Sequence, residues 1–154
     1  MPRIDERLAE LAIDLPDAPK PVAAYVPSVH ANDLVFVSGQ IPLRDGSLQA
    51  TGTVPSETGV ELAVAAARQC GINALAVLKS ALDGDLDRVQ RIIRIGVFVA
   101  SDPGFTDQPL VANGASELML DVFGDAGRHA RAAVGSVALP LNASVEVELV
   151  AQVD

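Results

Sequence analysis

ELAVAAARQCGINALAVLKSALDG (residues 61–84) and RIIRIGVFVA (residues 91–100) are the two stretches of this sequence that decide its fold. The first is rich in Ala and Leu, which favour helices, and its closing Asp83-Gly84 permits the left-handed conformation that commonly ends a helix. The second is dominated by Ile and Val, which favour strands. The sequence therefore predicts a long helix over 61–82 that leads into a buried strand over 91–100.

Toward the C-terminus, the pattern predicts one more helix and two more strands. Apolar residues at helical spacing favour a helix over 109–123, and an Ala- and Val-rich run favours a strand over 129–137. Residues 144–153 alternate, with Val145, Val147 and Leu149 on one side and Glu146 and Glu148 on the other. Strict alternation is typical of a strand with one buried and one polar face.

Toward the N-terminus, the pattern is weaker. We expect a short amphipathic helix over 3–13 and an extended Pro-rich connector over 15–21. Strands are predicted over 23–26 and 33–37, with a polar turn at 30–33 between them. The continuous apolar run in 33–37 indicates a strand that is buried on both faces.

A hairpin turn is expected at Asp45-Gly46. Together these elements predict a single α+β domain over 1–154, in which two main helices pack on one face of a mixed sheet and an N-terminal helix is added. Residues 1–22 form the N-terminal helix and connector of that domain.

Composition excludes several classes of function. The net charge of −9 disfavours nucleic acid, which is bound through clustered Lys and Arg. The three arginines at 88, 91 and 94 have acidic neighbours and are better explained as solvated charges. A lone Cys70 forms no disulfide within the chain, and neither a signal peptide nor a membrane-spanning run is evident, so we expect a cytoplasmic protein.

Familiar cofactor and metal motifs do not occur. No glycine-rich phosphate-binding loop is found, and His30 and His129 are far apart without clustered acidic residues. We therefore expect neither a metal nor an organic cofactor.

Arg131 is the main candidate for ligand binding, because a guanidinium within the apolar strand sequence ARAAVGSVALP needs a partner. That partner is either Glu146 or Glu148 within the chain, or the carboxylate of a ligand, which Arg grips with two parallel hydrogen bonds. Tyr25 and the Ser38-Gly39 pair are further candidates, since Gly allows close approach of a ligand or another backbone.

Five segments together carry a resemblance to a known family: SGQIP (38–42), NALAVLKSALDGDLDRV (73–89), IIRIGVFVAS (92–101), ARAAVGSVALP (130–140) and VEVELVA (145–151). From about Tyr25 to the C-terminus, the sequence resembles the Rid/YjgF family of reactive-intermediate deaminases. The resemblance implies a chorismate-mutase-like fold and homotrimers with ligand clefts between subunits. It also implies hydrolysis of reactive 2-imino acids to 2-keto acids and ammonia.

By the same resemblance, Arg131 holds the substrate carboxylate and Glu146 positions the attacking water. Tyr25, Ser38 and Gly39 line the cleft, and either Asn113 or Ser116 takes the place of the family's cleft asparagine. The region around the second helix is longer than usual, as in the longer subgroup that is often labelled endoribonuclease.

Two alternatives to the deaminase remain. A non-catalytic module that binds small carboxylates would keep Arg131 without needing Glu146. RNA cleavage is the least favoured, because the chain is acidic and offers no pair of His residues for acid–base chemistry.

Overall fold

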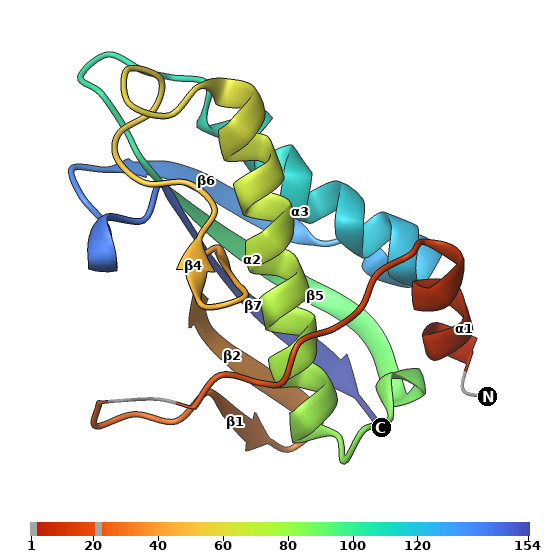
Figure 1. Ribbon diagram of the computed structural model, residues 1–154. Helices are drawn as coiled ribbons and strands as arrows, with labels where there is room; N and C mark the ends of the chain where they lie inside the picture. The colour runs from red at the N-terminus through yellow and green to blue at the C-terminus, as the bar shows by residue number, and fades with distance from the viewer. Residues whose placement is uncertain (1–2, 21–22) are drawn as a thin grey trace.

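The computed structural model describes residues 3–20 and 23–154, which form a five-stranded mixed sheet with helices on one face and a separate two-stranded hairpin (Figure 1). The sheet order is β1-β2-β7-β5-β6; β5 and β6 are parallel and the other neighbours are antiparallel. This arrangement confirms the predicted α+β class. The elements are α1 (Arg3–Glu10), β1 (Ser28–Ala31), β2 (Leu34–Gln40), β3 (Leu43–Arg44), β4 (Ser47–Leu48), α2 (Val60–Ala81), β5 (Val89–Ala100), α3 (Gln108–Phe123), β6 (Ala130–Ser136) and β7 (Val145–Val153), with short 3-10 turns η1 (Leu86–Arg88), η2 (Gly124–Gly127) and η3 (Pro140–Asn142).

The two main helices lie where the sequence predicts them. α2 begins one residue before the expected range and ends one residue before its end, and Gly84, with a φ of 93°, follows it as predicted. The helices approach closely because two glycines lie between them: a Cβ on Gly71 would meet the side chain of Leu118, and one on Gly114 would meet the backbone carbonyl of Val64. This close packing fixes the position of α3 relative to the sheet.

The core between helices and sheet is aliphatic. The alternation predicted for β7 is confirmed, since Val145, Val147 and Leu149 are buried while Glu146 and Glu148 are only partly buried. By length and composition, α2 is also apolar enough to cross a membrane. Most of that helix is buried inside the domain, which is typical of the core helix of a globular protein.

The N-terminal helix is shorter than expected. α1 ends at Glu10, because Ala12 adopts a positive φ of 53° that no helix can continue through. Asp87 anchors its first turn by accepting hydrogen bonds from the backbone N–H groups of Arg3 and Ile4 (2.7 and 2.8 Å). The connector then crosses in front of α2 (Figure 1); its last residue, Pro21, lies outside the described residues.

Two expectations for the first strands are wrong. Residues 23–25 form bends rather than a strand, and β1 begins only at Ser28. The hairpin sets this position, because Ala31 pairs with Leu34 across a two-residue turn in which Asn32 has a positive φ of 55°. β2 is not buried on both faces either: Val35 and Val37 are buried, whereas Phe36 is 45% exposed on the face without helices.

The predicted hairpin turn at Asp45-Gly46 is confirmed. Both residues have positive φ angles (51° and 78°), and Arg44 pairs with Ser47 across them. This small hairpin stands beside the main sheet and follows directly on β2.

Candidate functional site

Four of the candidate residues lie close to one end of the sheet, and we call them the Glu146 half-site: Glu146, Gly39, Ser38 and Tyr25. The pairing of β2 with β7 is irregular between Val37 and Gln40, so the backbone around Gly39 is displaced toward Glu146. A Cβ on residue 39 would lie 2.9 Å from the carboxylate carbon of Glu146. Only glycine therefore leaves room for the carboxylate in this position.

Hydrogen bonds hold the backbone of this half-site in place. Ser38 donates from its hydroxyl to the carbonyl of Val26 (2.7 Å), which ties β2 to the segment after Tyr25. Asn73 of α2 is buried and donates from Nδ2 to the carbonyls of Ile41 and Leu43 (3.0 and 2.9 Å). The chain on both sides of Gly39 is thus fixed before any ligand arrives.

The electrostatic setting of Glu146 suits a group that exchanges protons. Burial, and to a lesser extent the negative charge of Glu148, raises the pKa of Glu146 above its ordinary value. Glu148 itself pairs with Arg94 (3.6 Å), and no ion pair to Glu146 occurs among the described residues. A carboxyl group with a raised pKa can serve as a general base and then as an acid.

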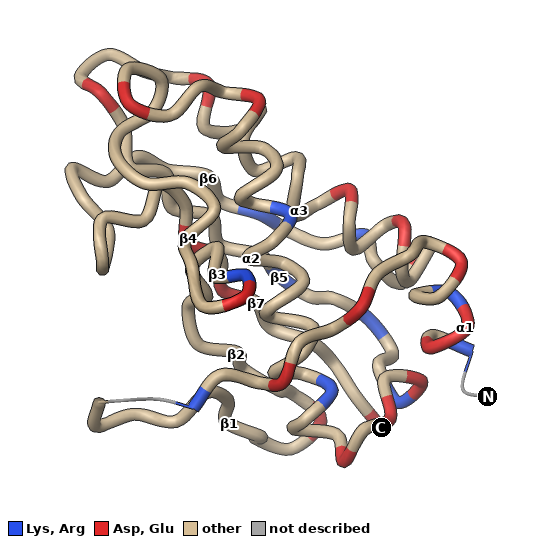
Figure 2. Tube along the Cα trace, viewed as in Figure 1, with Lys and Arg blue, Asp and Glu red and all other residues tan. Residues whose placement is uncertain are grey.

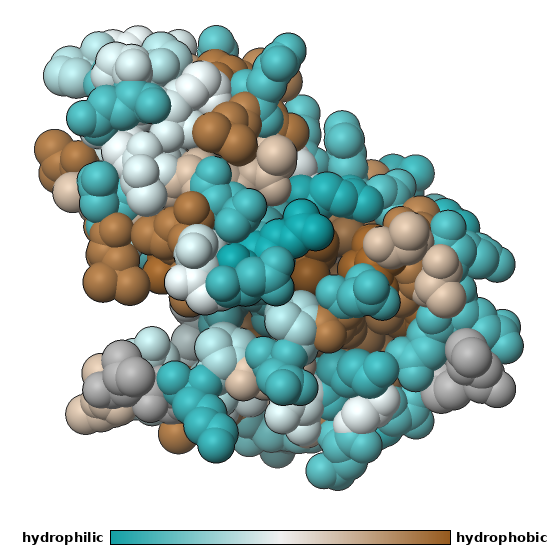
Figure 3. Space-filling model, viewed as in Figure 1, coloured by the Kyte–Doolittle hydropathy of each residue, from teal (hydrophilic) through white to brown (hydrophobic). Residues whose placement is uncertain are grey.

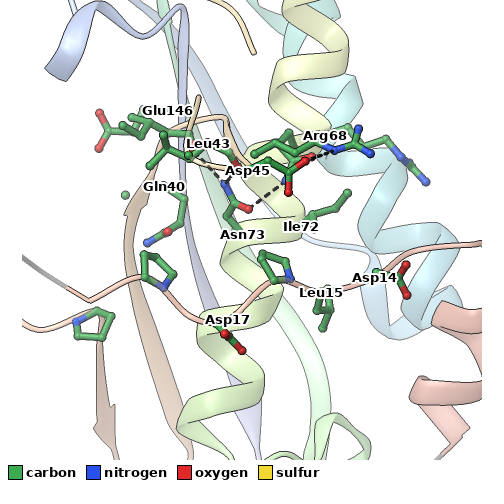
Figure 4. A pocket seen from close by; sticks show the side chains of 18 of the residues that line it. Asp14, Leu15, Asp17, Gln40, Leu43, Asp45, Arg68, Ile72, Asn73 and Glu146 are labelled. Carbon is green, nitrogen blue, oxygen red and sulfur yellow. Dashed lines mark hydrogen bonds and ion pairs between the residues drawn. The ribbon is translucent and has the colours of Figure 1, made fainter. Parts of the chain in front are cut away.

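A groove of about 1230 Å³ adjoins this half-site. It runs from the connector over α2 to Tyr25, Gly39 and Glu146, with Ile72 and Asn73 in its wall (Figure 4). In that view the carboxylate of Glu146 points away from α2. Figure 3 shows hydrophobic surface beside the connector with hydrophilic residues around it, which is a usual composition for a small-molecule site.

A second cluster of polar side chains, which we call the Arg131 half-site, consists of Arg131, Asn113, Ser116 and His129. Arg131 donates from Nη1 to Oδ1 of Asn113 (2.9 Å) and to Oγ of Ser116 (3.1 Å). Asn113 and Ser116 are three residues apart on α3, so both face the same side of that helix. The sequence left Asn113 and Ser116 as alternatives for the place of the cleft asparagine, and in the structure both contact Arg131.

The guanidinium of Arg131 has no carboxylate partner within the described part of the chain. It pairs with neither Glu146 nor Glu148, and it takes part in none of the ion pairs found there. Its side chain is exposed. A full positive charge is therefore held by neutral oxygen atoms and remains available to an anion.

The two half-sites lie on opposite faces of the sheet. Arg131 pairs across the strands with Ile95, and Ile95 pairs with Leu149, so the three side chains point to the same face of the sheet. Leu149 is buried beneath the helices, which identifies that face. Glu146 aligns with Phe98 on the face without helices. One chain therefore does not bring Arg131 and Glu146 together, although β6, which carries Arg131, is an edge strand that a second copy can approach.

His129 belongs to the site although the sequence assigned it no role. Its Nε2 lies 2.9 Å from Oγ of Ser116, and its Nδ1 lies 2.6 Å from the carbonyl oxygen of Gly127. The sequence offered only one weak signal, the position of His129 two residues before Arg131. Residues two apart on a strand point to the same face.

Comparison with known proteins places the chain in a family. Residues 5–153 match the family model described as "YjgF/chorismate_mutase-like, putative endoribonuclease". The chain belongs to this YjgF family, and both its fold and the five sequence segments agree with that membership.

Three relatives illustrate the range of the family. Protein TCP17 of Trypanosoma cruzi is 44% identical over 153 residues, which cover 99% of this chain and 95% of that protein. The crystal structure of the protein Atu1372 from Agrobacterium tumefaciens is 47% identical, covers 99% of this chain and 93% of that one, and superimposes with a TM-score of 0.92. The 2-iminobutanoate/2-iminopropanoate deaminase of Dermatophagoides farinae is 25% identical over 92% of this chain and 95% of that protein.

Proposed function

We propose that this protein hydrolyses reactive 2-imino acids to 2-keto acids and ammonia. The observation that carries the proposal is the guanidinium of Arg131, which is held by Asn113 and Ser116 and has no carboxylate partner among the described residues. A cation presented in this way suits a small carboxylate ligand. The name of the mite relative, a 2-iminobutanoate/2-iminopropanoate deaminase, supports the choice of substrate class.

In the proposed mechanism, Arg131 binds the carboxylate of the substrate while Glu146 acts on water. The imine carbon is already electrophilic, so a positioned water needs only orientation and a base. Glu146 takes a proton from the water as its oxygen bonds to the imine carbon, and passes that proton to the nitrogen to give a carbinolamine. Glu146 then moves the proton of the new hydroxyl to the nitrogen, so that the C–N bond breaks, the carbonyl forms and ammonia leaves. The reaction needs no cofactor.

The proposal includes a homotrimer, in which the Arg131 half-site of one copy meets the Glu146 half-site of the next. Two features support it. The half-sites lie on opposite faces of the sheet, and apolar side chains such as Phe36 and Val134 remain 45% exposed on the single chain. A closed ring of identical contacts would cover such a surface and complete every site. Sedimentation equilibrium should give the mass of a trimer, and a monomer mass at micromolar concentration would refute this part.

RNA is a poor fit as a substrate, despite the word endoribonuclease in the family's description. Among the described residues, Lys and Arg are few and scattered along the trace, without a continuous basic stripe (Figure 2). The chain carries a net charge of −9. Phosphate backbones bind mainly to clustered positive charge.

We also expect a cytoplasmic location for a protein that acts on short-lived products of metabolic enzymes.

The deciding assay measures ammonia release from 2-imino acids that are generated in the cuvette, beside a parallel assay of RNA degradation. We expect faster hydrolysis of the imino acid and intact RNA. A protein that binds small carboxylates through Arg131 but accelerates no imine hydrolysis would instead be a binding module. RNA cleavage without imine hydrolysis would contradict the proposal outright.

A further inference from the structure

A chain of three hydrogen bonds leads from the backbone of η2 to Arg131, and a fourth joins Arg131 to Asn113. The carbonyl of Gly127 lies 2.6 Å from Nδ1 of His129, and Nε2 of His129 lies 2.9 Å from Oγ of Ser116. Ser116 and Asn113 then both accept from Nη1 of Arg131. The direction of each bond follows from the chemistry of its two atoms.

The carbonyl of Gly127 determines the tautomer of His129. A carbonyl oxygen can only accept, so Nδ1 of His129 must carry the proton. In the neutral ring, Nε2 is then bare and must accept, and the hydroxyl of Ser116 is the donor to it. With its proton committed to His129, Ser116 presents its lone pairs to Arg131.

Packing keeps Gly127 in the place that this arrangement needs. A Cβ on residue 127 would meet the backbone carbonyl of Met119 in α3. Glycine therefore lets η2 lie directly against α3, and His129 follows two residues later beside Ser116. The same helix thus positions both ends of the hydrogen-bond chain.

The count of donors on Arg131 shows what remains for a ligand. A guanidinium carries five N–H donors, two of them on Nη1. Asn113 and Ser116 together occupy both hydrogens of Nη1. The donors left are those of Nε and Nη2, which lie along one edge and match the two oxygens of a carboxylate.

We propose that His129 and Ser116 are positioning residues that hold Arg131 so that its Nε/Nη2 edge, and not Nη1, receives the ligand carboxylate. This inference rests on the proposed function, in which Arg131 binds the substrate. It assigns His129 a role through Ser116 rather than a contact with substrate. If His129 and Ser116 served stability alone, variants at these two positions that still fold would bind the ligand with unchanged affinity.

Calorimetric titration with pyruvate, a small 2-keto acid, tests the inference in the full-length chain. Ser116→Ala removes one of the two acceptors that hold Nη1 of Arg131, and His129→Ala removes the group that orients the Ser116 hydroxyl. Each should weaken pyruvate binding about threefold to tenfold. Ser116→Thr, which keeps the hydroxyl, should recover most of the affinity that Ser116→Ala loses. In turnover assays the first two variants should raise KM more than they lower kcat.

His30→Gln is the matched control for His129→Gln. His30 is exposed on β1, at the edge of the sheet opposite to β6, so its replacement should leave pyruvate binding unchanged. A Gln at 129 can still accept from Ser116 through its amide oxygen, so His129→Gln should recover part of the affinity that His129→Ala loses.

The outcomes separate the inference from the proposed function. If Arg131→Ala abolishes pyruvate binding while Ser116→Ala and His129→Ala bind normally, the positioning role is overturned and the clamp stands. If Arg131→Ala binds as well as the unmutated chain, the clamp itself fails. Nitrogen-15 NMR gives a test without ligand: the neutral ring of His129 should be protonated at Nδ1, and a ring protonated at Nε2 would overturn the inference.

Discussion

The Glu146 and Arg131 half-sites are built in opposite ways. Glu146 is a partly buried carboxylate without an ion-pair partner among the described residues, and burial together with Glu148 raises its pKa. Arg131 is an exposed cation that neutral oxygens hold in place. Each half-site lacks what the other supplies, and the sheet separates them within one chain. In the proposed function, a complete site therefore requires two copies of the protein.

The largest effect is expected from Glu146→Gln. Gln keeps the shape of the side chain and can still hold a water, but it cannot take the proton, so kcat should fall by about 10² to 10³ while pyruvate affinity changes little. Glu61→Gln removes the same charge from an exposed position in the first turn of α2 and should leave kcat unchanged. A fall in affinity without a fall in kcat would contradict the assigned role.

Arg131→Lys should mainly affect binding. Lys keeps the positive charge but lacks the planar fork, and the loss of one charge-assisted hydrogen bond costs about 1.5–3 kcal/mol, or about one to two decades in Kd. Titration with pyruvate measures the change. Arg128→Lys, at an exposed arginine that pairs with Asp125, is the control. An unchanged Kd for Arg131→Lys would exclude the two-bond grip on the carboxylate.

Gly39→Ala should disturb the Glu146 half-site from the backbone side. The added Cβ would overlap the carboxylate of Glu146, so this carboxylate must move, and kcat should fall by about tenfold. Gly59→Ala is the matched control, because no atom lies within 4 Å of a Cβ at that exposed position. Equal kcat values for the two variants would show that the close contact at Gly39 has no catalytic role.

The smallest effect is expected from Glu148→Gln, and it concerns pH. Glu146 acts as a base only when it is ionised, so its raised pKa moves the acid limb of the kcat/KM profile to higher pH. Removing the negative charge of Glu148 lowers the pKa of Glu146 and should move that limb to lower pH. A shift to higher pH would mean that another group controls the limb.

Much of the fold could be predicted from the sequence because its signals are local. The composition of residues 61–82, the left-handed residues at Asp83-Gly84 and the alternation in β7 each act within a few neighbouring residues. The position of β1 could not be predicted in this way. Apolar residues at 23–26 favour a strand locally, but the pairing across the turn at Asn32 decides the register.

The candidate site was predicted less completely than the fold, for a related reason. Residue types alone allowed Arg131 to pair with Glu146 or Glu148, since all three occur on strands. The structure shows Asn113 and Ser116 instead, because α3 packs beside β6 and brings together residues 15 and 18 positions apart. The role of His129 depends on the same packing and on the carbonyl of Gly127, which no sequence pattern reveals.

The most direct test of the shared site is subunit mixing between two inactive variants. Arg131→Ala keeps Glu146, and Glu146→Gln keeps Arg131, so only a mixed oligomer can unite the two intact half-sites. After joint unfolding and refolding in equal amounts, random trimers should recover about a quarter of the unmutated activity in ammonia release. The opposite result is a mixture that stays as inactive as its two components while the unmutated chain refolds to full activity. In that case Arg131 and Glu146 do not act together across a subunit boundary, and the account is contradicted.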